Sequence, residues 1–325
     1  MVAPIKTNRT IVLGAGASRG ASYLTGPRFP SVLDNDFFDL LSQLPSGKHD
    51  SAVKDVLNWK LSLPTDSQNS LERAFYLLQT RAYLSEKFTS KKETHPTDDL
   101  VVSRFAKCVT ALLRYAHRTD TCKFHQEIFR QLGAGDAILS FNYDLVAERA
   151  LRYRAEPLGV SFNWLYGLDA KPALFEFPRL LRLHGSSNWR LGDDDQIRVR
   201  TRKWSELDIS PRYRGDQGAG TVFPIFLPFW DKHIEREPWL KIWKAAYLCL
   251  KSSDELIVWG YSLPPTDIKA RQLFGLAMNG RPFRLCVIDP APETQKRWRA
   301  LFPMAEYSQA ICVQDFLKDP PKWWR

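Results

Sequence analysis

Three side chains in this sequence could carry chemistry, because each follows an apolar segment and brings an amide, a carboxylate or an imidazole. Asn142 and Asp144 belong to the segment Ser-Phe-Asn-Tyr-Asp-Leu at 140–145, and His184 follows an apolar run later in the chain. An amide can orient a water molecule, and an imidazole can exchange a proton near neutral pH. Since a buried polar group without a partner costs about 1–3 kcal/mol, Asn142 and Asp144 either cap the next helix or face a ligand.

A glycine-containing turn follows the first apolar segment of the chain. The residues of this turn are Gly14, Ala15, Gly16, Ala17 and Ser18. Glycines let the backbone approach a phosphate, and the helix that follows offers its first N–H groups to the anion. The full dinucleotide-binding pattern has a third glycine where this chain has Arg19. A tight strand-to-helix turn also needs glycine, so the turn indicates phosphate binding only together with the strands around it.

Two further apolar segments end in polar residues. Gly260 and Ser262 follow one of them, and Asp289 follows the other. A carboxylate at the end of a strand can bind ribose hydroxyls. Asp289 can equally cap the predicted helix at 292–301. Asp267 is interpreted as the capping residue of the predicted helix at 267–278.

Alternating strands and helices must position these residues. Apolar runs predict strands at 10–13, 137–141, 180–183, 256–259 and 283–288, with a last strand at 311–313. Helical spacing predicts helices at 34–44, 71–88, 98–117, 124–132, 145–153, 239–251, 267–278 and 292–301. This alternation predicts an α/β, Rossmann-like fold, in which helices cover both faces of a parallel sheet. Ligands bind such sheets beyond the carboxyl ends of the strands, where the polar residues are expected to meet.

The chain is expected to form one domain from 1 to 325. Its Rossmann-like core comprises 1–44 and 131–325, and the helices of 45–130 form an insertion or cap. The segment 192–220 is polar, basic and glycine-bearing, which indicates a loop region.

Composition indicates a globular protein without membrane segments. Hydrophobic residues make up 44% of the chain, and no apolar run is long enough to span a bilayer, so a soluble, cytoplasmic protein is expected. The five cysteines include no Cys-x-x-Cys pair, so neither a disulfide framework nor a bound metal is expected. The net charge of +10 is dispersed, and it fits an anionic small ligand at least as well as nucleic acid.

The ordered set of motifs resembles the Sir2, or sirtuin-like, superfamily, and most closely the Sir2-like domains of bacterial antiphage-defence proteins. The motifs are GAGAS at 14–18, FNYD at 141–144, LHGS at 183–186, VWGYSLPPTD at 258–267 and VIDP at 287–290. They extend over most of the chain and leave 45–130 uncovered.

The resemblance implies NAD⁺ as the substrate. Asn142 would orient the nicotinamide ribose and the attacking water, Asp144 would lie near the nicotinamide carboxamide, and His184 would be the catalytic histidine. The residues that would bind the rest of NAD⁺ are Gly14, Ala15, Gly16, Ala17, Ser18, Gly260, Ser262 and Asp289. Asp289 stands where many sirtuins have an asparagine beside the adenosine.

Two departures from the sirtuin pattern bear on the activity. The sequence lacks the four-cysteine zinc module of sirtuin deacylases, and residues 23–30 differ from the deacylase loop Gly-x-Pro-x-Phe-Arg. Both departures are usual in the NAD⁺-hydrolysing defence branch. The resemblance therefore implies hydrolysis of NAD⁺ to nicotinamide and ADP-ribose, which would deplete NAD⁺ during phage infection.

Unchecked depletion would kill the host cell, so the activity is expected to be gated. The gate would be a homo-oligomer or a complex with a co-encoded defence protein, for example a HerA-type ATPase; nucleic acid would take part only indirectly, and no membrane is expected. Two other readings stay open, a non-catalytic NAD⁺- or ADP-ribose-binding scaffold beside a nucleic-acid-processing partner and a zinc-free protein deacylase. The basic charge fits the scaffold, whereas Asn142 and His184 favour the enzyme.

Overall fold

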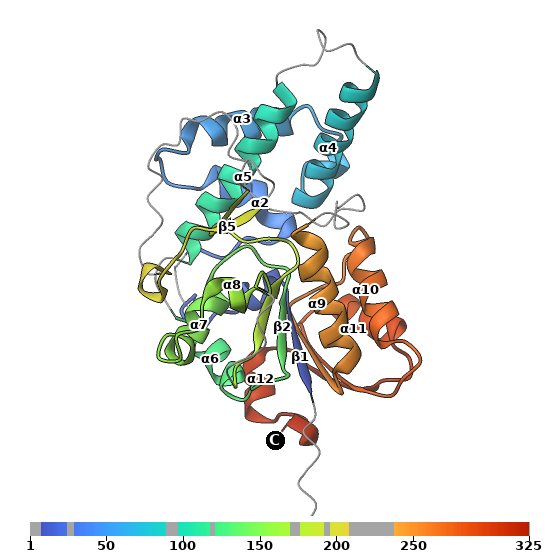
Figure 1. The fold of residues 1–325 in the computed structure, drawn as a ribbon. Coiled ribbons are helices and arrows are strands. Elements are labelled where there is room, and N and C mark those ends of the chain that lie inside the picture. The colour runs from blue at the N-terminus through green and yellow to red at the C-terminus, as the bar shows by residue number, and fades with distance from the viewer. Residues whose placement is uncertain are drawn as a thin grey trace, which may run out of the picture.

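A six-stranded sheet forms the centre of the protein, as the computed structural model in Figure 1 shows. The structure describes residues 8–24, 29–88, 97–117, 121–169, 176–191, 196–207 and 237–324. The strands of this sheet are β1 (Arg9–Leu13), β2 (Ala137–Ser140), β3 (Arg179–Arg182), β6 (Glu255–Trp259), β7 (Arg284–Ile288) and β8 (Glu306–Ala310). All neighbours pair in parallel, and every strand except β8 is almost wholly buried. The predicted α/β fold with a parallel sheet is confirmed.

The order of the strands changes direction beside β1. Across the sheet the order is β3-β2-β1-β6-β7-β8, so the chain steps outward to β3 and then resumes on the other side of β1. Leu13 at the end of β1 is in register with Ser140 of β2 and Trp259 of β6. Doubly wound sheets bind ligands at such a switch point, beyond the carboxyl ends of the strands. The residues that follow these three positions are therefore brought together.

Helices lie on both sides of the sheet, with α6 and α7 on one side and α9, α10 and α11 on the other (Figure 1). Their bounds are α6 (Lys123–Arg130), α7 (Val146–Ala155), α9 (Trp239–Ser252), α10 (Ile268–Met278) and α11 (Pro292–Leu301). Shorter helices are α1 (Ala15–Arg19), α8 (Phe162–Leu165) and α12 (Val313–Lys318). Within the core, the fully buried Trp298 of α11 packs edge to face on Phe274 of α10, with ring centroids 5.0 Å apart.

A second apolar core lies among the helices at the top of Figure 1, which we call the helical segment. Its helices are α2 (Phe37–Ser42), α3 (Asp50–Lys60), α4 (Leu71–Phe88) and α5 (Thr97–Ala116). The ring of the fully buried Phe105 contacts those of Phe37, Phe38, Trp59 and Phe75. Phe37 and Phe38 pack into this core although they precede residue 45, and the division at 44 and 131 stays a prediction.

Some predicted elements are wrong. The last strand is β8, not 311–313, because β8 is a polar, half-exposed edge strand that gives no apolar signal. The segment 192–220 includes β5 (Ile197–Val199), which pairs with β4 (Trp189–Leu191), and a 3₁₀ turn at Trp204–Leu207. Its other residues, 192–195 and 208–220, lie outside the described residues. Helices α3 and α8 have no predicted counterpart, since α3 buries only Ala52 and Val56 and α8 spans four residues.

Across the described ranges, no helix combines the length and the apolar character that crossing a membrane requires.

Candidate functional site

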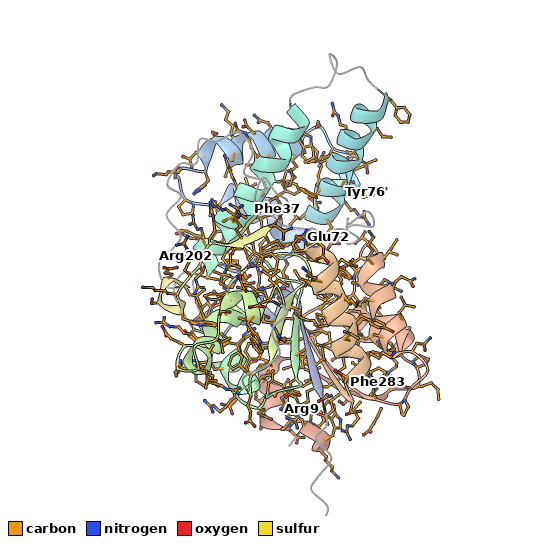
Figure 2. The ribbon with its side chains drawn as sticks, in the orientation of Figure 1. Arg9, Phe37, Glu72, Tyr76, Arg202 and Phe283 are labelled. Carbon is orange, nitrogen blue, oxygen red and sulfur yellow. The ribbon has the colours of Figure 1, made fainter. Side chains whose placement is uncertain are left out.

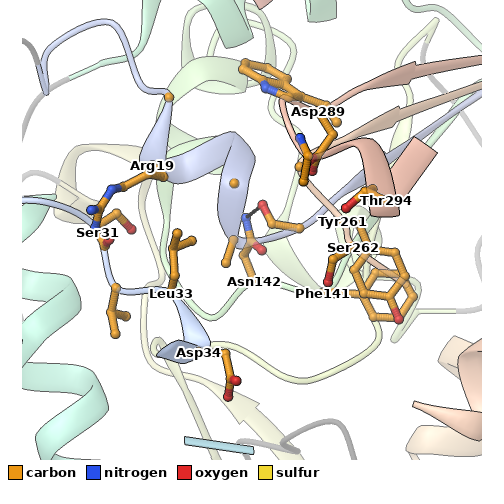
Figure 3. A pocket seen from close by; sticks show the side chains of 18 of the residues that line it. Arg19, Ser31, Leu33, Asp34, Phe141, Asn142, Tyr261, Ser262, Asp289 and Thr294 are labelled. Atoms are coloured by element: carbon orange, nitrogen blue, oxygen red, sulfur yellow. Dashed lines mark hydrogen bonds between the residues drawn. The ribbon is translucent and has the colours of Figure 1, made fainter. Parts of the chain in front are cut away.

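A pocket of about 700 Å³ opens at the carboxyl ends of the parallel strands (Figure 3). Each strand contributes a residue that follows it: Gly14 after β1, Asn142 after β2, His184 after β3, Gly260 after β6, Asp289 after β7 and Ile311 after β8. Small-molecule and cofactor sites occupy on the order of 300–1,000 Å³. Polar residues that the sequence places in five separate segments thus line one pocket of suitable size.

The two glycine turns of this pocket pack backbone against backbone. The N–H of Gly16 donates to the carbonyl of Gly260 at 3.0 Å, and the N–H of Ala17 donates to the carbonyl of Gly14 at 2.9 Å. A Cβ atom on Gly14 would lie 2.3 Å from the carbonyl oxygen of Gly260. One on Gly260, whose φ is +64°, would lie 2.2 Å from the nitrogen of Ala17. This contact by itself requires glycine. The amide groups of Gly14, Gly16 and Ala17 already have partners within the protein.

Asn142 lines the pocket, and its side-chain nitrogen holds the residue in position. It is 6% exposed, and its Nδ2 donates to the carbonyl of Gly14 at 2.8 Å and to Oγ of Ser18 at 2.9 Å. Because a carbonyl only accepts, this contact fixes which end of the amide is nitrogen. Oδ1 is buried and has no hydrogen-bond partner among the described residues. Figure 3 shows Asn142 in the middle of the pocket. Such an atom is expected to accept a hydrogen bond from a ligand or water.

Asp144 lines the pocket, and both of its carboxylate oxygens have partners within the protein. Its Oδ2 accepts from Oγ of Ser18 at 2.6 Å, and its Oδ1 accepts from the N–H of Val146 at 2.9 Å. Burial opposes its charge, but His117, Arg182 and these two hydrogen bonds lower its pKa below the usual value. Burial also lowers the pKa of His117 to about 4, so the cation beside Asp144 at neutral pH is Arg182. A contact of Asp144 with the nicotinamide stays a prediction.

A buried ion pair beneath the pocket holds the 140–144 loop. Arg182 and Glu148 are both inaccessible to solvent and form a salt bridge. The guanidinium of Arg182 also donates to the carbonyl of Asn142 at 2.8 Å, to the carbonyl of Asp144 at 2.7 Å and to Oγ of Ser140 at 3.0 Å. One fully buried cation therefore fixes the backbone that carries two of the predicted site residues.

His184 is held by a carboxylate on the loop after β6. Its Nε2 lies 2.9 Å from Oδ2 of Asp267, and both side chains are almost completely buried. The ring of His184 packs edge to face on Phe141, with centroids 4.8 Å apart, and stacks on Tyr143 at 6.3 Å. The same Oδ2 accepts from the hydroxyl of Tyr261 at 2.7 Å. The result is a buried histidine–aspartate pair, of which His184 lines the pocket.

The sequence predicts only the lesser part of this role for Asp267. It does cap α10, since its Oδ1 accepts from the N–H of Ala270 at 3.4 Å. Its contact with His184 spans 83 positions of the chain, and no local spacing encodes it. One sequence feature could have indicated this contact: Asp267 follows a buried strand, so it is expected at the same edge of the sheet as His184.

The other predicted residues lie at the pocket or directly behind it. Ala15 and Ser262 line the pocket, and Ser262 is exposed at its rim. Ala17 and Ser18 are buried behind the lining, where Ser18 bonds the side chains described above. These two residues support the pocket wall and do not form its surface.

Asp289 lines the pocket on the β7 side, near Thr294 and Tyr261 in Figure 3. Its carboxylate accepts from the N–H of Ala291 at 2.8 Å. Burial raises the pKa of Asp289, and the Ala291 amide, Thr294 and Arg297 partly offset this effect. The residue thus caps the turn into α11 while its side chain borders the pocket.

The wall opposite the sheet comes from the helical segment, which contributes no sequence motif. Apolar side chains of this wall are Leu71, Val109 and Leu113, joined by Val32 and Leu33 from the residues before α2. Glu72, labelled in Figure 2 where α4 begins, also lines the pocket, and its Oε2 accepts from the hydroxyl of Thr266 at 2.7 Å. Asp34 accepts from the N–H of Glu72 at 2.7 Å, which fixes the start of α4. The first turn of α4 is therefore tied to the loop that carries Asp267.

Within the described ranges, no three histidine, cysteine, aspartate or glutamate side chains come together in a group that could hold a metal ion.

Comparison with known proteins gives fold-level likeness alone. No protein-family model matches the sequence, and no curated protein matches it. The chain is similar to a Sir2 enzyme solved for the mechanism and regulation of Sir2 enzymes, with 14% identity, a TM-score of 0.42 and coverage of 92% of this chain and 86% of the other. It is also similar to a Sir2 complex with an inhibitor, 2′-O-acetyl-ADP-ribose and a deacetylated peptide, with 11% identity, a TM-score of 0.39 and coverage of 96% and 91%. Likeness at this level carries no argument about the site or the activity.

Proposed function

We propose that the chain hydrolyses the bond between nicotinamide and ribose in NAD⁺, giving nicotinamide and ADP-ribose. The observation that carries the proposal is the buried Oδ1 of Asn142: the residue lines the pocket, and this atom has no partner among the described residues. An atom in this state accepts a hydrogen bond from water or from a ribose hydroxyl without first giving up another.

The reaction needs few groups, because the leaving group is already cationic. The bond from C1′ to the nicotinamide nitrogen breaks, its electron pair neutralises the ring, and positive charge develops on the ribose. A water that Asn142 orients forms the new bond to C1′, and His184 takes its proton. The ionised Asp144 in the pocket wall stabilises the developing positive charge. Its lowered pKa keeps it ionised at neutral pH.

The motif order that resembles the defence branch of the Sir2 superfamily supports a physiological role. In that role the enzyme depletes NAD⁺ during phage infection and is gated by assembly or by a co-encoded partner. The helical segment is a candidate site for the gate, because Glu72 and Leu71 line the pocket at the start of α4.

The test is incubation of the purified chain with NAD⁺, alone and with its genomic neighbours, followed by chromatography of the products. Nicotinamide and ADP-ribose are expected in equal amounts. Asn142→Ala should abolish their release, whereas Asn279→Ala, at an exposed position after α10, should leave it unchanged. Absence of turnover under every condition, combined with NAD⁺ binding, would favour the scaffold instead. Wild-type turnover in a folded Asn142→Ala variant would remove Asn142 from the mechanism.

A zinc-free protein deacylase is the second candidate, and the apolar wall of the pocket favours it. Leu33, Leu71 and Val109 offer a surface on which an acyl chain could lie. Such an enzyme would consume NAD⁺ only in the presence of an acylated lysine peptide. Adding that peptide to the same assay separates the two activities.

A further inference from the structure

Asp267 has two separate tasks, and only one of them requires a carboxylate. Its Oδ1 caps α10 through the N–H of Ala270, a task that serine or asparagine performs equally well. Its Oδ2 receives Nε2 of His184 at 2.9 Å and the hydroxyl of Tyr261 at 2.7 Å. A capping residue has no need of this second set of contacts. The second oxygen therefore indicates a function directed at His184.

We propose that Asp267 is a positioning residue that holds the neutral imidazole of His184 as its Nε2–H tautomer. A carboxylate only accepts hydrogen bonds, so Nε2 must be the nitrogen that carries hydrogen. The lone pair of the neutral ring then lies on Nδ1, which is the nitrogen that takes up a proton. The last step rests on the proposed function, in which His184 takes the proton of the attacking water.

The surroundings keep Asp267 in this role. Burial and the neighbouring Asp267 carboxylate raise the pKa of Tyr261 well above its usual value, so its phenol remains a hydrogen-bond donor. Tyr261 is itself stacked on Phe141, with ring centroids 4.0 Å apart. The loop between them and Asp267 contains Leu263 at a φ of +50°, a conformation that costs a non-glycine residue free energy. Packing thus holds the loop in a conformation that places Oδ2 against His184.

Asp267→Asn tests the proposal because it changes one oxygen into a donor. The N–H of Ala270 and the N-terminus of α10 favour an acceptor, so the amide oxygen should stay toward the helix. The amide nitrogen then replaces Oδ2 and donates to Nε2, which moves the ring proton to Nδ1. Heteronuclear NMR of ¹⁵N-labelled protein at alkaline pH reports this tautomer, with His184→Gln to assign the signals.

Nε2–H in the wild type and Nδ1–H in Asp267→Asn support the proposal. A wild-type ring with its proton on Nδ1, or an unchanged tautomer in the variant, overturns it. This readout needs no turnover, so it stands even where NAD⁺ hydrolysis is not observed. Failure of the proposed function and failure of the positioning role are therefore distinguishable.

A double-mutant cycle tests the same proposal through activity. In an active enzyme, Asp267→Asn should lower kcat by about 10²–10⁴-fold, as a misplaced base does, with little change in KM. In the His184→Ala background the same substitution should have no further effect. Asp267→Ser, which keeps a capping hydroxyl, should give a similar loss and guards against a folding defect of the amide. Equal effects of Asp267→Asn in both backgrounds would show a purely structural role and overturn the proposal.

Discussion

Replacing Arg182 by methionine should destabilise the protein far more than replacing a solvent-exposed arginine does. The substitution keeps most of the volume of the side chain and removes its charge and every donor. Glu148 is then left fully buried without a counter-ion, and the carbonyls of Asn142 and Asp144 lose their donor. The effect combines an unpaired buried charge with unpaired backbone groups.

Its magnitude follows from the burial of the pair. Breaking a buried ion pair by removing one partner costs about 3–5 kcal/mol, whereas an exposed pair contributes roughly 0–1 kcal/mol. Both Arg182 and Glu148 are 0% exposed, so solvent does not screen the loss. Large domains shift by roughly 2 °C per kcal/mol, so a fall in melting temperature of about 6–10 °C is expected.

The assay is thermal unfolding of purified variants followed by circular dichroism. Arg130→Met is the matched control, because Arg130 forms an exposed pair with Glu127 on the surface of α6. Arg182→Met combined with Glu148→Gln removes the lone buried charge and should recover part of the loss. The carbonyls of the 140–144 loop still lack their donor, so recovery should be incomplete. The reasoning is refuted if Arg182→Met melts no earlier than Arg130→Met.

Three further predictions concern other parts of the molecule. Gly260→Ala should destabilise the protein by more than 1 kcal/mol, because its Cβ would lie 2.2 Å from the nitrogen of Ala17 at a φ of +64°; denaturant titration measures this, and a change within error would contradict it. His184→Ala should lower NAD⁺ turnover by about 10²–10⁴-fold while calorimetry shows NAD⁺ still bound, and lost binding would make the histidine a ligand contact. Burial lowers the pKa of His117 to about 4; Arg149 and His125 lower it further, and Asp144 opposes them. Between about pH 6.5 and 4, His117 therefore takes up a proton in the unfolded chain but not in the folded protein. Stability attributable to His117 should therefore fall as pH drops from about 6.5 to 4, and urea titrations should show a smaller fall in His117→Gln but not in His49→Gln.

Most strands of the sheet could be predicted from the sequence because they are buried on both faces. Such strands are continuous apolar runs, and the polar residues that end them mark the carboxyl edge of a parallel sheet. The edge strand β8 lacks this signal, since Glu306–Ala310 alternates weakly and is half exposed. Its existence is set by pairing with β7, which is a tertiary contact.

The candidate site was predictable only where chemistry coincides with a strand end. Asn142 and His184 meet this condition, and both line the pocket. The contact from Asp267 to His184 and the wall formed by Leu71 and Val109 depend on packing between distant segments. Leu71 and Val109 also belong to the second core, and nothing in the local sequence of α4 or α5 indicates that they line a pocket as well.

The contact between the two glycine turns determines where the pocket can change. Gly14 and Gly260 meet with no space for a Cβ atom, so this part of the pocket wall is made of main chain. Substitution cannot reshape a surface that has no side chains, and any replacement there moves two loops together. A mutant library aimed at new ligands should therefore randomise Leu33, a half-buried side chain across the pocket, rather than Leu71 or Val109, which are buried in the second core.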